Sequence, residues 1–354
     1  MRPTTVPIIE GEFRRILVRA TNWVGDAVMS LPALQALRKR FPEAHIAILA
    51  RPWVADIYGR ENFANEVIPY TLPRGWQDLG AKWRFAQELR KRSFDAAILL
   101  PNAFEAAALV WLAGIPKRIG YARDGRGFLL TTAVQRPALG EIPRHERFYY
   151  LELLRRAGII DALPESDQIR LGGADEARTA GLAKFAALGL RDVTGLSPGA
   201  AFGTAKRWLP DRFADAVAQL GHTAALFGSK DERALCESIA DNLRRRGIPV
   251  HNFAGETTLS EYIELAAACR IYLTNDSGSM HIASALNVPT IAVFGATDHI
   301  GTGPTGPLAR VVREHVECSP CLLRECPIDH RCMKAVTAER VVREANELTS
   351  LSQQ

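Results

Sequence analysis

The chain has 354 residues, of which 47% are hydrophobic, and its 44 basic and 39 acidic residues give a net charge of +5. That length is too great for one typical core and fits two α/β domains, and the small charge excess does not indicate nucleic acid binding. The longest apolar runs, such as 96–100 and 291–294, have strand length, so none could span a bilayer. Residues 1–14 carry Glu10 and Glu12 and lack the apolar core of a signal peptide, so we expect a cytoplasmic protein.

Apolar, strand-like runs alternate with helix-like segments along the chain. The runs lie at 15–19, 45–50 and 95–100 in the first half, and at 193–197, 223–227, 271–274 and 290–294 in the second. Such alternation predicts parallel sheets covered by helices. The pattern restarts at Val193, where a strand enters a Pro-Gly turn. We therefore place the domain boundary near 165–190 and predict domains 1–175 and 176–354.

The first strand-to-helix turn, residues 21–26, reads Thr-Asn-Trp-Val-Gly-Asp. It precedes a helix predicted at 27–40, where apolar residues recur at helical spacing. Asp26 thus lies at the carboxyl end of a strand, where open α/β sheets bind their ligands. The alternative is that Asp26 is only a favourable charge at a helix N-terminus.

Two further features of the first half suit a polar ligand. Asn102 follows the strand at 95–100 and either borders a binding site or only forms the turn. Arginines gather at positions 118, 123, 126, 144 and 147. An amphipathic phosphorylated glycolipid would need such partners, but a solvated basic surface would have the same composition.

The second half begins with a polar loop suited to a diphosphate. Small residues there expose backbone N–H groups and a lysine supplies a mobile cation; the candidates are Ser197, Gly199, Gly203, Thr204 and Lys206. A later turn, 227–232, ends another strand. Its Glu232 or Asp231 would accept hydrogen bonds from a ribose, unless both are only helix N-terminal acids.

A third turn, residues 275–281, reads Asn-Asp-Ser-Gly-Ser-Met-His and opens a helix-like segment. The first N–H groups of such a helix lack partners and favour an anion. Gly278 allows close approach of a phosphate, Ser277 can cap the helix or bind a phosphate oxygen, and Asp276 can reach a ribose hydroxyl. Asp276 and Ser277 would also serve as ordinary caps. The loop 295–299, after the strand at 290–294, is a weaker candidate for the same site.

The six cysteines fall into two groups. Cys236 and Cys269 sit in apolar, helix-like surroundings typical of buried thiols. The other four lie within 318–332, with His330 nearby: Cys318, Cys321, Cys326 and Cys332. In a cytosolic chain this density favours metal over disulfide, but the spacing is not a usual zinc pattern. Structural zinc, redox-active thiols and free thiols all remain open, and we predict no metal site.

Taken together, these motifs resemble the ADP-heptose:lipopolysaccharide heptosyltransferases of glycosyltransferase family nine. The resemblance rests on Gly25-Asp26 with the run 30–34, on 197–200 leading to Lys206-Arg207-Trp208, and on 275–278 with His281. Within that family, residues 18–26 and the cysteine-rich tail 318–332 are most similar to the group called heptosyltransferase II. Each motif is weak alone, but together and in this order they are specific.

The resemblance implies a GT-B architecture, in which two Rossmann-like domains face each other across a cleft and the last helix, here 337–350, often crosses back to the first domain. It implies ADP-heptose as donor, a phosphorylated lipopolysaccharide inner-core acceptor, inversion at the anomeric carbon and no catalytic metal or cofactor. It places Lys206 on the phosphates and His281 against the donor. Where the family's first heptosyltransferases have paired threonines, this chain has Ala201 and Phe202, so Thr204 is the nearest hydroxyl.

A sugar nucleotide already carries a good leaving group, so the enzyme must deprotonate an acceptor hydroxyl and neutralise the departing diphosphate. Asp26 is the expected general base, and Lys206 the cation that stabilises the leaving group. Asn22, Trp23 and Asn102 would border the acceptor, with the indole of Trp23 offering an apolar face to a sugar ring. Peripheral contact with the inner membrane would follow from a lipid acceptor.

Three other classes share parts of this pattern. A nicotinamide-dependent oxidoreductase would have G-x-G-x-x-G after the first strand, and residues 20–26 contain no such run. A sugar-nucleotide epimerase of the same architecture would need no lipid acceptor. A non-catalytic nucleotide-sensing module would bind nucleotide and tolerate the loss of Asp26.

Overall fold

The structure is a computed structural model that describes residues 13–73, 75, 77–164 and 168–351. The chain divides into two compact units, Met1–Ser166 and Asp167–Gln354. This division lies before the expected boundary at 175 because the intervening segment already pairs with the second unit. The Ile169 N–H donates to Thr305 Oγ1 at 2.9 Å, and the Leu171 N–H donates to the Ala285 carbonyl at 2.9 Å.

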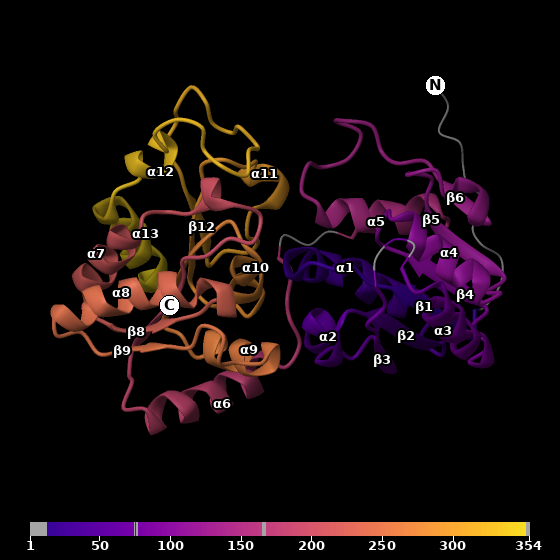
Figure 1. Cartoon of the computed structure of the whole chain (residues 1–354), viewed down its shortest axis with the longest axis horizontal. Helices are drawn as coiled ribbons and strands as arrows, with labels where there is room; N and C mark the ends of the chain where they lie inside the picture. Colours follow the sequence, from indigo (N-terminus) through magenta and orange to yellow (C-terminus); the bar gives the residue numbers. More distant parts are fainter. Residues whose placement is uncertain (1–12, 74, 76, 165–167, 352–354) are drawn as a thin grey trace. The chain divides into compact units, whose positions relative to one another are not determined.

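The first unit is a parallel sheet of six strands in the described residues, covered by helices (Figure 1). The strand order is β3-β2-β1-β4-β5-β6. The elements are β1 (Arg15–Arg19), α1 (Val24–Arg40), β2 (His45–Ala50), α2 (Pro52–Gly59), β3 (Glu66–Pro69), α3 (Leu79–Lys91), β4 (Ala96–Leu99), α4 (Phe104–Leu112), β5 (Lys117–Tyr121), the 3₁₀ turn η1 (Gly127–Leu129), β6 (Thr132–Val134) and α5 (Arg147–Arg156).

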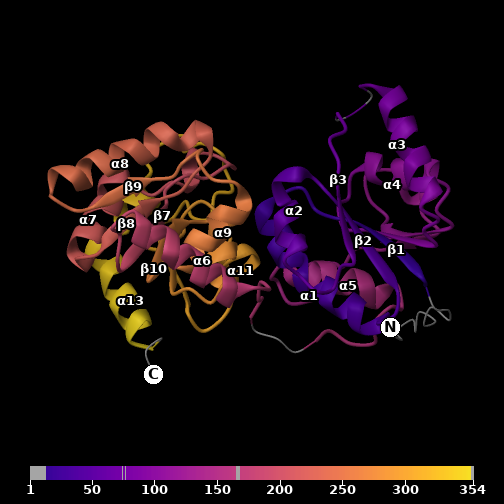
Figure 2. The same cartoon turned by 90° about the horizontal axis from the view of Figure 1, so that it is seen from below.

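The second unit repeats this architecture, with strand order β12-β11-β10-β7-β8-β9 (Figure 2). Its elements are α6 (Ala174–Ala187), β7 (Val193–Ser197), η2 (Thr204–Lys206), α7 (Pro210–Leu220), β8 (Thr223–Leu226), η3 (Lys230–Glu232), α8 (Arg233–Arg245), β9 (Val250–Asn252), α9 (Leu259–Ala267), β10 (Ile271–Asn275), α10 (Gly278–Ala285), β11 (Thr290–Val293), α11 (His299–Thr302), β12 (Ala309–Val312), α12 (Arg331–Ala335) and α13 (Ala338–Leu351).

Both sheets have the Rossmann strand order, which reverses direction between the first and fourth strands of each unit. In such sheets ligands bind outside the carboxyl ends of the two strands at the reversal. These strands are β1 and β4 in the first unit and β7 and β10 in the second. The loops that follow them are therefore the places to look for a site. All seven strand-like runs of the sequence form strands, and the predicted α/β class is confirmed.

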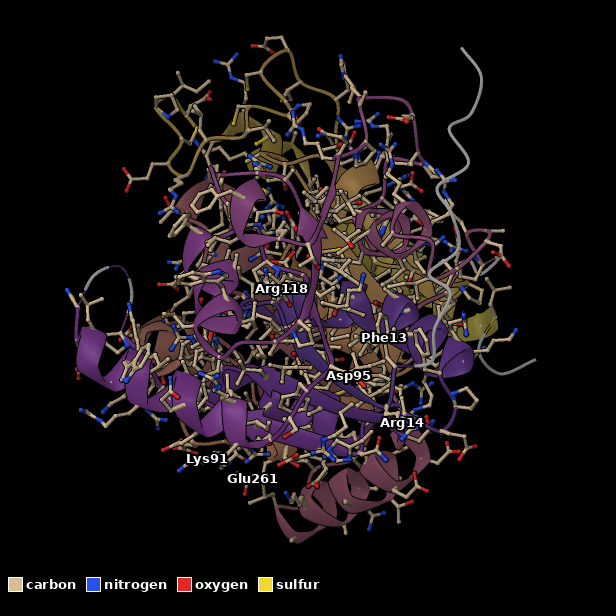
Figure 3. The ribbon with its side chains drawn as sticks, turned by 90° about the vertical axis from the view of Figure 1, so that its right-hand side faces the viewer. Phe13, Arg14, Lys91, Asp95, Arg118 and Glu261 are labelled. Carbon is tan, nitrogen blue, oxygen red and sulfur yellow. The ribbon has the colours of Figure 1, made fainter. Side chains whose placement is uncertain are left out.

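The amino edge of the first sheet is fixed by a side chain that bonds to the neighbouring strand. Asp95, just before β4, accepts the backbone N–H groups of Arg14 and Arg15 at 2.7 and 3.1 Å. Figure 3 labels Asp95 and Arg14 at this edge. Both backbone donors would otherwise lack a partner at the start of β1, so the carboxylate stabilises the pairing of β1 with β4.

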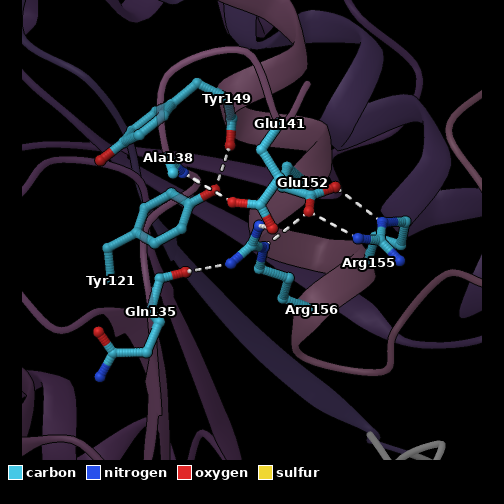
Figure 4. A network of polar contacts seen from close by, with 8 residues as sticks. All are labelled: Tyr121, Gln135, Ala138, Glu141, Tyr149, Glu152, Arg155 and Arg156. Carbon is cyan, nitrogen blue, oxygen red and sulfur yellow. Dashed lines mark hydrogen bonds and ion pairs between the residues drawn. The ribbon is translucent and has the colours of Figure 1, made fainter. Parts of the chain in front are cut away.

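Helix α5 is anchored by a buried carboxylate, shown in Figure 4. Glu152 is fully buried and accepts hydrogen bonds from Arg155 Nε and Arg156 Nε at 2.7 and 2.6 Å. Arg156 also pairs with Glu141, and Tyr121 Oη donates to the Tyr149 carbonyl at 2.7 Å. Burial opposes ionisation of Glu152, but the two guanidinium groups outweigh it and lower its pKa. This network fixes the helix that carries Tyr149 and Tyr150.

The last helix, α13, packs on the second unit. Its buried residues Val341, Ala345 and Leu348 belong to the core formed by β7, β10 and β11, and the helix lies against α7, β11 and β12. The second unit therefore uses the apolar face of this helix, and the expected return of 337–350 to the first domain stays a prediction. No helix of the described residues combines the length and the apolar character needed to cross a membrane.

Candidate active site

Asp26 lies in the first turn of α1, beyond the carboxyl end of β1. The helix begins at Val24 rather than at the predicted residue 27, so Asp26 faces the N-terminal N–H groups. Its Oδ1 accepts a hydrogen bond from Tyr150 Oη of α5 at 3.0 Å. The carboxylate is thus oriented by a helix that follows it by more than a hundred residues.

The surroundings of Asp26 favour a proton acceptor. Burial raises the pKa of Asp26, and the hydrogen bond from Tyr150 opposes this rise only in part. Glu146, one turn before Tyr150, is exposed, yet its pKa is also raised, because neighbouring protein atoms partly desolvate its carboxyl and because the charge of Asp26 repels its own. A carboxylate with a raised pKa binds a proton more strongly than a solvated one, as a general base must.

A prediction about pH follows from the Tyr150 contact. In Tyr150→Phe the hydrogen bond that lowers the pKa of Asp26 is lost and the burial that raises it remains. Asp26 must be ionised to act as a base, so the acidic limb of the kcat/KM profile should move to higher pH. Activity on the alkaline plateau should change little. A pH profile of kcat/KM measures this, and an acidic limb that stayed in place would contradict the role of the contact.

Asn22 and Trp23 lie in the same turn as Asp26, as expected. Asn22 Oδ1 accepts from Arg19 at 2.9 Å, and its carbonyl accepts from Trp53 Nε1 at 2.8 Å. Trp23 is exposed and leaves its indole face open. Asn102 instead braces the unit, since its Nδ2 donates to Tyr149 Oη at 2.9 Å.

Two of the five clustered arginines turn inward. Arg126 is fully buried and donates to the carbonyls of Tyr121, Pro101 and Ala103. Arg118 donates to the Leu129 and Ile115 carbonyls. These side chains hold loops together, so the expected surface cluster for a phosphorylated ligand does not include them.

In the second unit, Lys206 and Asp276 meet at the carboxyl ends of β7 and β10. Lys206 Nζ lies 2.6 Å from Asp276 Oδ2, and Thr297 Oγ1 donates to the same oxygen at 2.6 Å. Only 6% of the Asp276 side chain is exposed. Lys206 Nζ also lies 4.8 Å from the centre of the Phe202 ring. Asp276, expected at a ribose, thus orients the lysine, and the loop after β11 contributes Thr297.

Some of the other candidate residues near the loop after β7 make contacts within the domain, and others lie at the surface. Ser197 Oγ lies 2.6 Å from the hydroxyl of Tyr272, so it is used within the domain. Gly199 lies directly under the carboxylate of Glu232, which would have to move to admit a side chain at this position. Glu232 accepts from the Ser229 backbone and hydroxyl at 2.9 and 3.1 Å, which makes it a helix-capping residue as well as a candidate ligand. Thr204 is exposed at the start of η2.

The turn after β10 presents an uncapped helix. Ser277 precedes α10 but its hydroxyl lies 3.2 Å from Thr274 Oγ1, and no side chain caps the helix within the described structure. Gly278 begins the helix, so the first N–H groups of α10 have only a small residue in front of them. His281 is buried one turn further on. This end of α10 has the geometry of an anion site.

The cysteine-rich segment, residues 318–332, packs against the loops that follow β7 and β11. Its Arg324 carbonyl accepts the Ala205 N–H at 3.0 Å, and His330 Nε2 lies 3.1 Å from the Ala205 carbonyl. Ser319 Oγ donates to the Gly295 carbonyl at 2.6 Å. All six thiols are free, and the described residues contain no cluster of three or more His, Cys, Asp or Glu side chains placed to hold a metal ion. The segment therefore supports the loops on either side of Lys206.

Sequence reasoning missed Tyr150 and Glu146 and gave Thr297 little weight. Tyr150 is 124 residues from Asp26 and lies in no local motif, so only the fold brings it to the carboxylate. Thr297 had a usable signal, because it follows a predicted strand at the same sheet edge as the other donor loops.

The chain is similar to known proteins over most of its length. Residues 82–331 match glycosyltransferase family 9 (heptosyltransferase). Lipopolysaccharide heptosyltransferase 2 of Escherichia coli K12 is 33% identical, covering 94% of this chain and 98% of that protein. The Salmonella typhimurium protein of the same name is 34% identical, covering 84% and 88%.

A solved structure agrees with these similarities. The structure described as E. coli ADP-heptose lps heptosyltransferase II has a TM-score of 0.80 and 30% identity, covering 96% of this chain and all of that one. Its fold confirms the prediction of a GT-B protein made of two Rossmann-like domains. The chain is therefore a glycosyltransferase, and it belongs to glycosyltransferase family 9, the heptosyltransferases.

Proposed function

We propose that the protein is an inverting glycosyltransferase that moves a heptose from ADP-L-glycero-D-manno-heptose to the first heptose of the lipopolysaccharide inner core. The observation that carries the proposal is the similarity to lipopolysaccharide heptosyltransferase 2 over 94% of the chain. The polar residues at the carboxyl edges of the two sheets support it, because they supply a base in one unit and a cation beside a helix N-terminus in the other.

Asp26 acts as the general base in this proposal. Its carboxylate takes the proton of the acceptor hydroxyl, and the hydroxyl oxygen attacks the anomeric carbon from the face opposite ADP. The bond between that carbon and the phosphate oxygen breaks, and its electron pair leaves with ADP. One displacement inverts the anomeric centre, so no covalent nucleophile is needed. Tyr150 orients the base, and Asn22 and Trp23 border the acceptor. Asn102 is retained as a residue that shapes the acceptor side through Tyr149.

The second unit binds ADP-heptose. Lys206 neutralises the charge that develops on the diphosphate. Asp276 holds the ammonium group of Lys206 in place, and Thr297 donates to the same carboxylate oxygen of Asp276. The N-terminus of α10, with Ser277 and Gly278, binds a phosphate, and Thr204, two residues before Lys206, offers an exposed hydroxyl. Glu232, above Gly199, accepts from the ribose. Ser197 and His281 support this site from within the domain. No metal or other cofactor is required.

The acceptor is a glycolipid, so we place the protein in the cytoplasm, in peripheral contact with the inner membrane. Large apolar side chains exposed on the first unit support such contact, among them Leu79, Trp83 and Trp111. Such residues are typical of surfaces that lie against a bilayer.

The donor site can be tested separately with Gly278→Val. A branched side chain at the first position of α10 would occupy the space that a phosphate needs, so the dissociation constant for ADP should rise by about 10-fold or more. Gly59→Val is a matched control, because a side chain at Gly59 in α2 would meet no atom within 4 Å. Calorimetry measures both affinities. Full ADP affinity in a folded Gly278→Val protein would reject this turn as the phosphate site.

Mass spectrometry tests the activity itself. The protein is incubated with ADP-heptose and with truncated lipopolysaccharides that end before or at the first heptose. Addition of one heptose only to the acceptor that carries the first heptose supports the proposal. Addition to the shorter acceptor would indicate a family member with a different core acceptor. A changed sugar nucleotide without any transfer would indicate an epimerase.

A further inference from the structure

The first unit contains a cavity of about 850 Å³ that the transfer reaction described above does not use. We call it the α3–α4 pocket. It lies at the carboxyl edge of the sheet, where Arg19 ends β1, Arg51 follows β2 and Tyr70 follows β3, and α3 and α4 form its walls. Figure 2 shows these two helices beside each other, and they are in contact.

One end of the pocket holds two buried arginines. Arg19 is 3% exposed and Arg51 is 5% exposed, and their guanidinium carbons lie 4.7 and 4.4 Å from the centre of the Tyr70 ring. Their hydrogen bonds go to neutral oxygens: Arg19 to the Ala20 carbonyl and Asn22 Oδ1, and Arg51 to the Leu72 carbonyl.

Within the residues that the structure describes, neither arginine forms an ion pair. Glu105, the acid among the described lining residues, attracts Arg19 without forming an ion pair with it; it accepts from the Gly75 N–H at 3.1 Å and lies 4.0 Å from Lys82. Buried cations without a counter-ion are costly, so this end of the pocket favours an anionic group such as a phosphate or carboxylate.

Apart from Lys82 and Glu105, most of the remaining lining of the pocket is apolar. Ala108, Leu109 and Leu112 line it from α4, and Leu79 and Trp83 line it from α3. Leu79 and Trp83 are 56% and 53% exposed. Such large apolar side chains at the rim of an apolar cavity are unfavourable in water and favourable against lipid. A cationic end and an apolar body together suit an anionic amphiphile.

We propose that the α3–α4 pocket binds an acyl chain of the acceptor glycolipid, with an anionic group of the same molecule at Arg19 and Arg51. The proposal rests on the function proposed above and names a part of the acceptor that the transfer chemistry does not touch. The pocket is linked to the catalytic turn, because Arg19 and Trp53 both donate to Asn22, four residues before Asp26. An acceptor anchored in the pocket therefore has its anionic end beside that turn.

The test compares two acceptors in the same detergent: the truncated lipopolysaccharide with its acyl chains, and the same molecule after complete deacylation. In the wild type, kcat/KM should be about 10-fold or more higher for the acylated acceptor, because burying even a few methylene groups gives that factor. Ala108→Phe fills the pocket, so the ratio should fall to about one while the value for the deacylated acceptor stays unchanged.

Three further variants complete the experiment. Ala133→Phe makes the same change at an exposed position of β6 outside the pocket and should keep the wild-type ratio. Trp83→Ala removes an exposed rim residue with little risk to folding and should lower the ratio several-fold. Arg51→Met should weaken both acceptors alike, because both keep their anionic groups.

The outcomes separate the possible readings. The proposal would be overturned if the wild-type ratio of kcat/KM for the acylated over the deacylated acceptor were near one, or if Ala108→Phe left that ratio unchanged. Equal binding of wild type and Ala108→Phe to phosphatidylglycerol vesicles, together with an unchanged ratio, would assign the rim to the bilayer surface instead. Absence of transfer to either acceptor would reject the proposed function. In that case, binding of a dansylated fatty acid to the wild type and no binding of it to Ala108→Phe would still establish the pocket.

Discussion

Replacing Asp26 with Asn should lower the turnover of heptose transfer by roughly 10²- to 10⁴-fold. The amide keeps the size of the side chain and can still contact Tyr150, but it cannot accept the proton of the acceptor hydroxyl. The half-buried carboxylate has a raised pKa, so the proton acceptor that is lost is a stronger base than an ordinary aspartate. ADP affinity should stay unchanged, because the residues proposed to bind the donor belong to the second unit. Steady-state kinetics and calorimetry measure the two effects.

A matched control separates catalysis from helix stabilisation. Asp211 occupies the first turn of α7, as Asp26 occupies that of α1, and its Oδ1 accepts from Asn242 at 3.2 Å. Asp211→Asn removes the same favourable interaction with a helix N-terminus, which is about 0.3–1 kcal/mol of stability, without affecting a base. If Asp26→Asn reduced transfer no more than Asp211→Asn does, Asp26 would be only a helix charge.

The sequence was informative where a strand, a turn and a helix follow one another directly. This pattern singled out Asp26 and Gly278 as candidates, and both do follow strands, whose carboxyl ends share one edge in each parallel sheet. Strands with a weaker apolar pattern were not predicted. β3 is short and lies at the edge of its sheet, and β5 begins with Lys117 and Arg118, so neither has an apolar run.

Contacts between distant residues could not be predicted from one sequence. Lys206 and Asp276 were both proposed as ligands of the donor, but 70 residues separate them and nothing local indicates that they form an ion pair. Arginine is usually a surface residue, yet Arg126 is fully buried, because its guanidinium donates hydrogen bonds to loop carbonyls that would otherwise lack a partner. Such pairings depend on how the loops fold back over the sheet, which the periodicity of apolar residues in the sequence does not indicate.

The ion pair also determines what the loss of Lys206 would do. In Lys206→Ala the carboxylate of Asp276 remains buried, with the hydroxyl of Thr297 as its remaining side-chain donor in the described structure. Some loss of stability is therefore expected in addition to any loss of rate. Thermal melting separates the two, because a purely structural role would lower the melting temperature without a specific effect on the chemical step.

At saturating donor, Lys206→Ala should raise the barrier by on the order of 3 kcal/mol, which is roughly two orders of magnitude in kcat. The loss should appear in kcat, because the lysine interacts most strongly with the diphosphate as charge develops on it. Lys206→Arg keeps the charge and should recover part of the rate, whereas Lys334→Ala, at an exposed position of α12, should have no effect. If Lys206→Ala kept its rate and lost only stability, the lysine would serve to neutralise Asp276, and another group would have to stabilise the departing ADP.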